Sequence, residues 1–313
     1  MVNEGAVSVL PREAAVGSPV QKLSSEQVAE FISRGFLRFD GVVPEEINQI
    51  ALEELRRAEE LSGRGTVDGI PSPLDERLFD SGKSTLSEHF ERLPGIRAFC
   101  NLPIVRGGYE SLVGPDPYHD SHAVHTRKRG QPSQHLHADA IFDMRAAFDI
   151  QLMYYPQQVT REGGGTMIVP GSHLRQVDGG TIARYQNFAG QVYMEGSAGS
   201  VLILHNGIWH CGRRNRTDAV RYMFKVRLGA RVRQTGLWDS SDLTDDDVRR
   251  RVWETLYTLE PWFEGPAGNI ERLQRMALFR HMSGDTRFGQ GQLDDVIGRV
   301  ENQAFPRLRD IVP

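Results

Sequence analysis

The sequence predicts a mainly β protein, a sandwich, barrel or jelly roll, with helices added before and after it. Two observations predict this class. Between residues 118 and 230 the chain is a series of short strand-like runs separated by glycine-rich and polar turn clusters, which is typical of all-β folds. Before and after this stretch, apolar residues recur at helical spacing instead. A chain of 313 residues can form one such domain, since barrels and sandwiches often reach this size undivided.

The chain is expected to open with a flexible arm, a helix and a strand. Residues 1–22 are small, polar and aperiodic, as in a loose terminal arm. Ser24 and Gln27 have the spacing of a capping box, and Gly35 is placed to end the helix that follows. A short strand is expected at 36–40.

More helices are expected ahead of the β core. One begins near Pro44, and a helical stretch covers 86–113 with interruptions near Pro94 and Pro103. The segment 62–84 is rich in Gly, Pro, Ser and Asp and is too long for a simple connector. It is expected to be a flexible loop near the active site.

The β core, a jelly-roll candidate, is expected at 118–235. Its clearest strand-like runs are 122–127, 148–155, 166–169, 191–194, 200–205 and 222–228. The dipeptide Asn206-Gly207 predicts a hairpin turn. Residues 236–313 are expected to be a helical extension, since Thr244 and the three aspartates after it favour a helix start. A single domain is predicted over residues 23–313, and its first part, 23–117, holds the N-terminal helices and the first strand.

Composition excludes several classes of protein. Hydrophobic content of 39% and charged content of 25% are ordinary for a soluble globular chain. A net charge of −4 gives no general attraction to nucleic acid or anionic lipid, and no run approaches the ~18 apolar residues of a membrane span. Cys100 and Cys211 cannot build a disulfide framework, and the N-terminus does not read as a signal peptide. We expect a cytoplasmic protein without nucleic-acid or membrane partners. A homodimer is compatible with the sequence, which does not fix the oligomeric state.

A candidate metal site combines His137-Ala138-Asp139 with His210. Two imidazoles and one carboxylate on one face of an octahedral metal leave three positions open, the facial triad that suits Fe(II) and O₂ chemistry. Two open positions can take a bidentate 2-oxo acid, and the third takes O₂. Arg221 opens the next strand and could bind the distal carboxylate of 2-oxoglutarate with its planar fork. His-x-Asp alone occurs often by chance, so this context strengthens the prediction.

Several nearby residues have simpler interpretations. His135 shares a face with His137 if the strand alternates, but only His137 forms His-x-Asp. His173 follows Pro-Gly, a turn signature, and is expected to be structural. Cys211 is expected to point away from the metal. The basic run 127–129 is expected to be solvated, with the alternative that it lines a cleft for an acidic substrate.

Three motifs in a fixed order resemble those of a known family. They are His137-Ala138-Asp139, the run 164–173 (Gly-Gly-Thr-Met-Ile-Val-Pro-Gly-Ser-His), and His210 followed by Asn215, Asp218 and Arg221. Over roughly 23–230 the chain resembles the phytanoyl-CoA dioxygenase family of Fe(II)/2-oxoglutarate-dependent oxygenases.

The resemblance implies a double-stranded β-helix of the cupin type, a jelly roll. It implies that the triad binds Fe(II), that Arg221 anchors 2-oxoglutarate as co-substrate, and that Gln134 and Thr166 contact it. Strict strand alternation would point Gln134 away from His137, so Gln134 needs a local irregularity. Gly212 stands where the family often has serine, a departure that weakens an assignment to acyl-CoA substrates.

The expected activity is that of a dioxygenase acting on an unactivated C–H bond of a small molecule, with release of succinate and CO₂. A secondary metabolite or similar small organic acid is the expected substrate. Asp139 favours hydroxylation over halogenation, because halogenases of related folds lack this carboxylate, while desaturation, epoxidation and ring formation stay open. The alternative is a cupin-like metal- or ligand-binding protein without oxygenase activity. A nucleic-acid demethylase is disfavoured by the acidic net charge.

Overall fold

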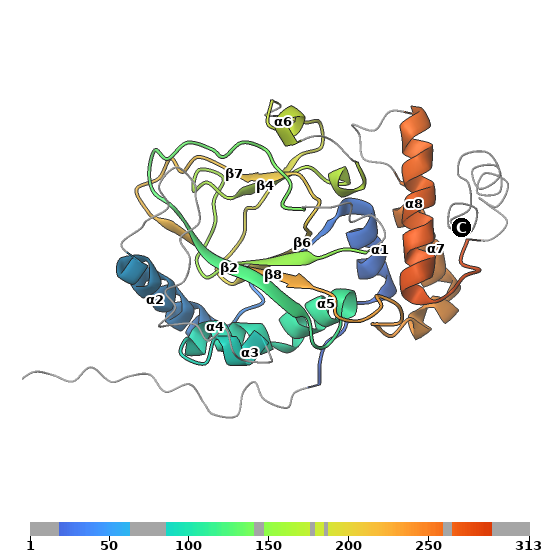
Figure 1. Cartoon of the computed structure of the whole chain (residues 1–313), viewed down its shortest axis with the longest axis horizontal. Helices are drawn as coiled ribbons and strands as arrows, with labels where there is room; N and C mark the ends of the chain where they lie inside the picture. The colour runs from blue at the N-terminus through green and yellow to red at the C-terminus, as the bar shows by residue number, and fades with distance from the viewer. Residues whose placement is uncertain are drawn as a thin grey trace, which may run out of the picture.

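Two antiparallel sheets form the centre of the computed structural model (Figure 1). The larger sheet has five strands in the order β1-β6-β3-β8-β2, and the smaller has three in the order β5-β4-β7. In chain order the strands are β1 (Phe36–Phe39), β2 (Tyr118–Arg127), β3 (Ile150–Tyr155), β4 (Thr166–Ile168), β5 (Val192–Tyr193), β6 (Ser200–His205), β7 (His210–Gly212) and β8 (Arg221–Gly229).

The structure describes residues 19–62, 86–140, 147–175, 179–184, 187–258 and 265–289. The expectations for most of the arm at 1–22 and for nearly all of the loop at 62–84 therefore lie outside the described residues.

Strand β8 shows how the larger sheet separates two cores. Phe224 and Val226 point to one face and join the large core cluster that the helices cover, whereas Met223 points to the other face. There it packs with Ile168 of the smaller sheet. The inner faces of the two sheets therefore enclose a second core, as side-chain alternation requires. This arrangement confirms the predicted mainly β fold with a jelly-roll core.

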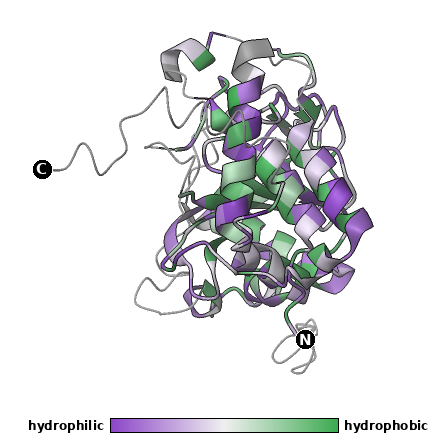
Figure 2. Ribbon diagram, turned by 90° about the vertical axis from the view of Figure 1, so that its right-hand side faces the viewer, coloured by the Kyte–Doolittle hydropathy of each residue, from purple (hydrophilic) through white to green (hydrophobic). Residues whose placement is uncertain are grey.

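Helices cover the outer face of the larger sheet and one end of it (Figure 1). The hydropathy colours in Figure 2 show hydrophobic and hydrophilic residues along the same helices, as in amphipathic surface helices. None of the helices in the described ranges is long and apolar enough to cross a bilayer. In chain order the helices are α1 (Ser25–Arg34), α2 (Glu45–Ser62), α3 (Leu86–His89), α4 (Pro94–Asn101), α5 (Pro103–Val113), α6 (Gly179–Ile182), α7 (Asp246–Tyr257) and α8 (Gly265–Ser283), with short 3₁₀ turns at Ser172–Leu174 and Ser241–Thr244.

Local signals at the helix ends are confirmed. Ser24 and Gln27 form the capping box of α1, and Gly35 ends this helix in a left-handed conformation with φ of 80°. A Cβ atom at Gly35 would lie 2.4 Å from Nδ1 of His173, so this position requires glycine for space as well. Pro94 and Pro103 are the first residues of α4 and α5, where the missing N–H costs nothing.

The hairpin predicted at Asn206-Gly207 is wrong. A turn does lie there, but β6 before it belongs to the larger sheet and β7 after it to the smaller one. The chain therefore crosses from one sheet to the other at this turn. The three-residue strand β7, too short to show an alternating pattern, was not expected at all.

Candidate active site

Two histidines are brought together by a cross-strand pair. His137 and His210 form an antiparallel bridge in which each N–H donates to the other's carbonyl, at 3.0 and 2.8 Å. Side chains of such a pair lie next to each other, and the two imidazole centroids are 4.6 Å apart. The N–H of Asp139 donates to the carbonyl of Asn206 at 3.0 Å, which fixes the third residue at the same turn. The ligand atoms of His137, Asp139 and His210 all lie within 4.8 Å of one another.

Hydrogen bonds orient both imidazoles toward this point. Nδ1 of His137 lies 2.8 Å from the carbonyl of His135, and Nδ1 of His210 lies 3.0 Å from the carbonyl of Ile208. A carbonyl only accepts, so each Nδ1 carries the proton and each Nε2 is left as a metal donor. Burial and the neighbouring His137 lower the pKa of His210 to about 3. The ring is therefore neutral at physiological pH, the form that binds metals.

The third ligand, Asp139, is an ionised carboxylate. Lys225 Nζ lies 2.5 Å from its Oδ2, and Arg227 Nη2 lies 2.8 Å from its Oδ1. Burial opposes ionisation, but the nearby imidazole of His210 and the charges of Lys225 and Arg227 outweigh burial and hold the pKa of Asp139 well below its usual range. Two imidazole nitrogens and a carboxylate oxygen are a donor set that suits Fe(II).

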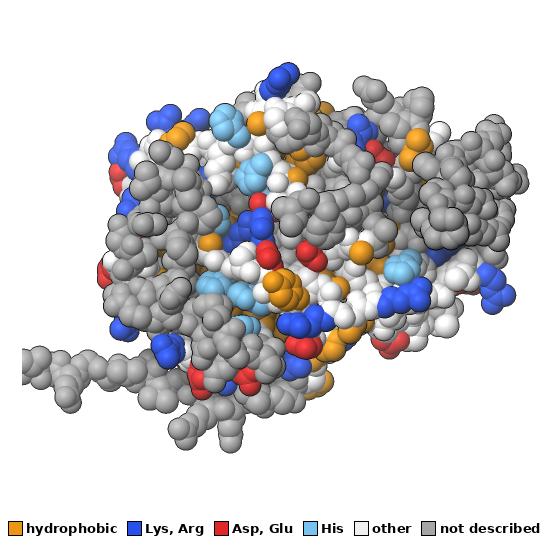
Figure 3. All heavy atoms as spheres, in the orientation of Figure 1, with side chains coloured by type: hydrophobic (Ala, Val, Ile, Leu, Met, Phe, Trp, Pro, Cys, Tyr) orange, Lys and Arg blue, Asp and Glu red, His pale blue; other side chains and the backbone are white. Residues whose placement is uncertain are grey.

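His137 and Asp139 of the triad line a cavity of about 350 Å³. On the face of the molecule shown in Figure 3, histidine, basic and acidic side chains gather near the middle. Nε2 of His125 is buried without a hydrogen-bond partner among the described residues, and burial together with the charge of Lys225 holds the pKa of His125 well below its ordinary value. The lining residues are Ser121, His122, Ala123, His125, Gln134, His137, Asp139, Lys225 and Arg227.

Arg221 is a buried cation that lacks a counter-ion among the described residues. Its side chain lies between the sheets with the residue 4% exposed, and neither Nε nor Nη1 has a hydrogen-bond partner there. Burial lowers the pKa of Arg221 to about 10, although the nearby Tyr155 opposes this, and the charge of Arg127 lowers the pKa further. Native proteins rarely leave such groups unpaired. The guanidinium therefore fits a carboxylate ligand that is not part of the chain.

Gln134 lines the cavity beside the triad, whereas Thr166 lies against Tyr155 and is not one of the lining residues. Oγ1 of Thr166 lies 2.7 Å from the hydroxyl of Tyr155, and the guanidinium carbon of Arg221 lies 5.7 Å from the centre of the same tyrosine ring. Oε1 of Gln134 accepts from the N–H of Gly212 at 2.8 Å. Residues 131–136 are not in a strand, and this irregularity lets Gln134 line the cavity with His137.

The rival histidines lie outside the triad. His135 is exposed, and only its carbonyl contributes, through the bond to His137. Nε2 of His173 lies 3.0 Å from the carbonyl of Ile32, and the side chain is buried. Cys211 packs in a separate apolar cluster with Met167, away from the triad, because it alternates with His210 along β7.

The basic run at 127–129 divides between interior and surface. Lys128 Nζ lies 3.0 Å from Glu59, and Arg129 pairs with Asp218, both at exposed positions. Only Arg127 is buried, and its Nη1 donates to the carbonyl of Pro132 at 3.1 Å. None of the three lines the cavity at the triad.

Sequence reasoning missed Lys225, Arg227 and His125 as site residues. The signal was present in the alternation of β8. Because side chains alternate along a strand, Lys225 and Arg227 lie on the same inner face as Arg221. His125 follows from the register of β2 with β8, where it lies opposite Met223.

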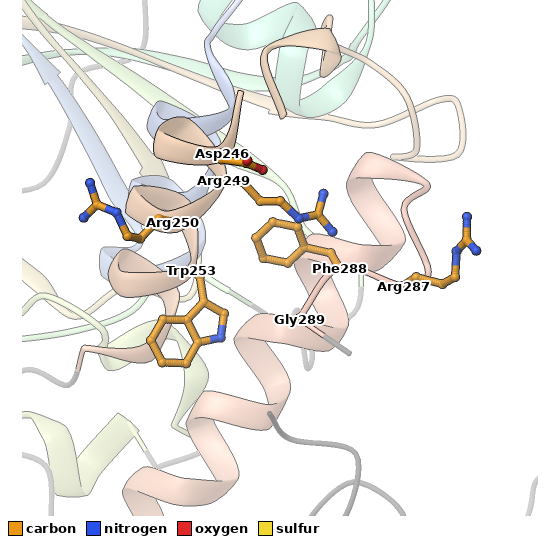
Figure 4. Close-up of a pocket in the computed structure, with 7 residues that line it drawn as sticks. All are labelled: Asp246, Arg249, Arg250, Trp253, Arg287, Phe288 and Gly289. Carbon is orange, nitrogen blue, oxygen red and sulfur yellow. The ribbon is translucent and has the colours of Figure 1, made fainter. Parts of the chain in front are cut away.

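A second cavity, of about 330 Å³, lies between α7 and the segment after α8 (Figure 4). Arg249 lies over the ring of Phe288, 4.9 Å from its centre, and Trp253 stacks on Tyr257 with ring centroids 4.7 Å apart. Two of its arginines pair with acidic neighbours, Arg249 with Asp285 at 3.2 Å and Arg250 with Asp247 at 3.1 Å. No described residue lines both this cavity and the one at the triad.

Fold and triad together define a class, the non-haem oxygenases built on a double-stranded β-helix. The family model described as phytanoyl-CoA dioxygenase (PhyH) matches residues 33–223. The chain belongs to the phytanoyl-CoA dioxygenase family, as its motifs predicted, and the family makes it an oxidoreductase. A comparison of the sequence with curated proteins gives no match.

Comparison with solved structures gives matches at low sequence identity, and HygX shares the fold. HygX from Streptomyces hygroscopicus, solved with nickel and 2-oxoglutarate bound, is 18% identical over 73% of this chain and 94% of that chain, with a TM-score of 0.52. SnoK, a non-heme alpha ketoglutarate dependent carbocyclase from nogalamycin biosynthesis, is 18% identical over 68% of this chain and 87% of that chain, with a TM-score of 0.44. EctD from S. alaskensis is 15% identical over 69% and 83%, with a TM-score of 0.46.

Proposed function

We propose that this chain is an Fe(II)- and 2-oxoglutarate-dependent dioxygenase that oxidises an unactivated C–H bond of a small molecule, releasing succinate and CO₂. One observation carries the proposal beyond metal binding. Arg221 is buried with two guanidinium nitrogens unpartnered among the described residues, on the same inner face as the triad cavity. A protein that only bound metal would gain nothing from a buried unpaired cation.

The residues divide the work between metal and co-substrate. His137, Asp139 and His210 would hold Fe(II), which supplies the oxidising chemistry together with 2-oxoglutarate and O₂. The carbonyls of His135 and Ile208 keep the two rings in the ligating tautomer. Arg221 would pair with the distal carboxylate of 2-oxoglutarate, with Thr166 and Gln134 completing the pocket.

Hydroxylation is the proposed outcome, because Asp139 supplies a carboxylate where a halogenase needs a vacant position. The cavity of about 350 Å³ lies in the size range of small-molecule sites, which supports a free metabolite, such as a secondary metabolite, as substrate. Cys100 and Cys211 are free buried thiols, a use of cysteine that fits a reducing cytoplasm.

Anaerobic titration of Fe(II) and 2-oxoglutarate tests the proposal. A 2-oxo acid that chelates Fe(II) gives a weak charge-transfer band in visible light, which needs no knowledge of the substrate. We expect the band in the wild type, its loss in Asp139→Ala and its weakening in Arg221→Ala. Arg216→Ala is the matched control, because the Arg216 side chain is 73% exposed and forms an ion pair with Glu162 at the surface.

Metal binding without the band would contradict the 2-oxoglutarate assignment. The non-oxygenase cupin-like function would then be preferred, since the triad alone permits it. If the band forms, succinate release in the presence of candidate substrates identifies the reaction.

A further inference from the structure

Three cationic side chains project from the inner face of β8 at two depths. Arg221, Lys225 and Arg227 share this face because side chains alternate along a strand. At a rise of ~3.3 Å per residue, the backbone positions of Arg221 and Lys225 lie about 13 Å apart. Arg221 lies beside Tyr155, whereas Lys225 and Arg227 contact Asp139 and line the cavity. The two outer cations are therefore separate from the one assigned to 2-oxoglutarate.

Lys225 and Arg227 share one acidic partner inside the cavity. Lys225 contacts Oδ2 of Asp139 and Arg227 contacts Oδ1. Asp139 is the single acidic side chain among the described residues that line the cavity. Arg227 also lies 3.7 Å from Asp120, but that carboxylate is 47% exposed, so solvent screens the pair.

Metal binding would draw on this same carboxylate. Both oxygens of Asp139 are engaged by cations, and ligation of a metal takes one of them. The charge balance that follows rests on the proposed function. The two positive charges of the metal and the two negative charges of 2-oxoglutarate cancel, and Asp139 balances one of the three cations on β8. Two positive charges then remain in a largely buried site, where unpaired charge is costly.

We propose that the substrate is an organic anion, and that its carboxylate or phosphoryl group is bound by Lys225 and Arg227 beside the metal triad. The two side chains are 12% and 23% exposed, so they are largely desolvated and still reachable from the cavity. Arginine offers a planar fork for an oxyanion, and lysine offers a mobile point charge. Because both cations contact a metal ligand, the oxidised carbon lies within a few bonds of the anionic group.

Sulfate is the first probe, used on protein loaded with Ni(II) in place of iron and with 2-oxoglutarate, so that no turnover occurs. Sodium sulfate replaces sodium chloride at constant ionic strength, and the melting temperature is followed. We expect a saturable rise in the wild type and in the control Arg216→Gln. Apparent sulfate binding is expected to be about tenfold weaker, or more, in Arg227→Gln and in Lys225→Met. The general salting effect of sulfate does not saturate and is common to all variants.

Equal saturable curves in the wild type and in Arg227→Gln would overturn the proposal, and so would the absence of a saturable rise in the wild type. Arg227→Gln alone suffices if Lys225→Met does not fold. Propionate and methyl phosphate, titrated in the same way, separate a carboxylate from a phosphoryl group, and preferential binding of either one supports the class. If the charge-transfer band forms in the wild type but anions do not bind, this inference fails alone. If the band never forms, the proposed function and this inference fail together.

Discussion

Replacing Arg221 by methionine is predicted to stabilise the ligand-free protein while removing its affinity for 2-oxoglutarate. The guanidinium is buried, and two of its nitrogens have no partner among the described residues. The folded state therefore holds this charge less favourably than the unfolded chain does, in which water surrounds it. Methionine has a similar length and no charge, so it keeps most of the packing between the sheets.

The size of the effect follows from the pKa of Arg221, which burial lowers to about 10. Set against an ordinary arginine pKa of ~12.5, and at about 1.36 kcal/mol per pKa unit, this corresponds to about 3 kcal/mol. A base whose pKa falls on folding weakens the folded state at pH values below its folded pKa, hence at neutral pH. Arg221→Met should raise the free energy of unfolding by up to about 3 kcal/mol. Loss of a buried charge pair with 2-oxoglutarate costs about 2–5 kcal/mol, which is at least about thirtyfold in affinity.

Urea unfolding of metal-free protein measures the first effect, and anaerobic 2-oxoglutarate titration measures the second. Arg216→Met, at an exposed position, is the control for the loss of a positive charge in general. The reasoning is refuted if Arg221→Met is less stable than the control variant, because Arg221 would then have a structural role. It is also refuted if the variant binds 2-oxoglutarate as tightly as the wild type does.

Three further predictions concern stability and metal binding. Burial raises the pKa of Glu54 to about 7. Its contribution to stability is therefore complete below its unfolded pKa, ~4.3, and is lost as the pH rises through 7. Glu54→Gln should remove this loss of up to about 3 kcal/mol in urea unfolding measured across pH, and an unchanged pH profile would contradict the prediction. Gly35→Ala should lower the free energy of unfolding in urea more than Gly130→Ala does, by at least about 1 kcal/mol. Both glycines have φ of 80°, but only a methyl group at position 35 would meet a side chain, that of His173. Equal losses of stability would show that His173 moves aside. In a calorimetric Ni(II) titration, His173→Ala should leave the metal affinity unchanged although it lowers stability, whereas His210→Ala should abolish metal binding. Loss of metal binding in both variants would make His173 part of the site.

Helix ends were predictable because their signals are local. The capping box at Ser24 and Gln27, the left-handed Gly35 and the prolines that open α4 and α5 each act within one helical turn. Most strand-like runs were recognisable for a similar reason, since a short apolar run bounded by turn residues is visible within a few residues of chain.

The crossing between sheets could not be predicted from such signals. Asn206-Gly207 has the composition of a hairpin turn, but whether the strands on either side pair is decided by distant partners. β6 pairs with β1 and β3, and β7 pairs with β4. A three-residue strand such as β7 exists because Thr166–Ile168 lies beside it, and nothing within its own three residues indicates this.

The same limit separates the predicted part of the site from the missed part. His137, Asp139 and His210 could be proposed because a metal demands particular residue types, and the structure brings their ligand atoms within 4.8 Å of one another. Lys225 and Arg227 have no motif. Their place follows from the face of β8 on which Arg221 lies, and that face is fixed by the packing of the two sheets.

Strand β8 therefore links stability to ligand binding. Arg221 has no acidic partner among the described residues. Lys225 and Arg227 share one, Asp139, which would also bind the metal. In each case the missing negative charge would come from a small molecule, the co-substrate for Arg221 and the substrate for the other two. A ligand that binds only the folded state stabilises it by mass action, so each anion should both complete the site and raise the free energy of unfolding. The burial that makes the charge of Arg221 costly in the free protein would also favour its pairing with an anion.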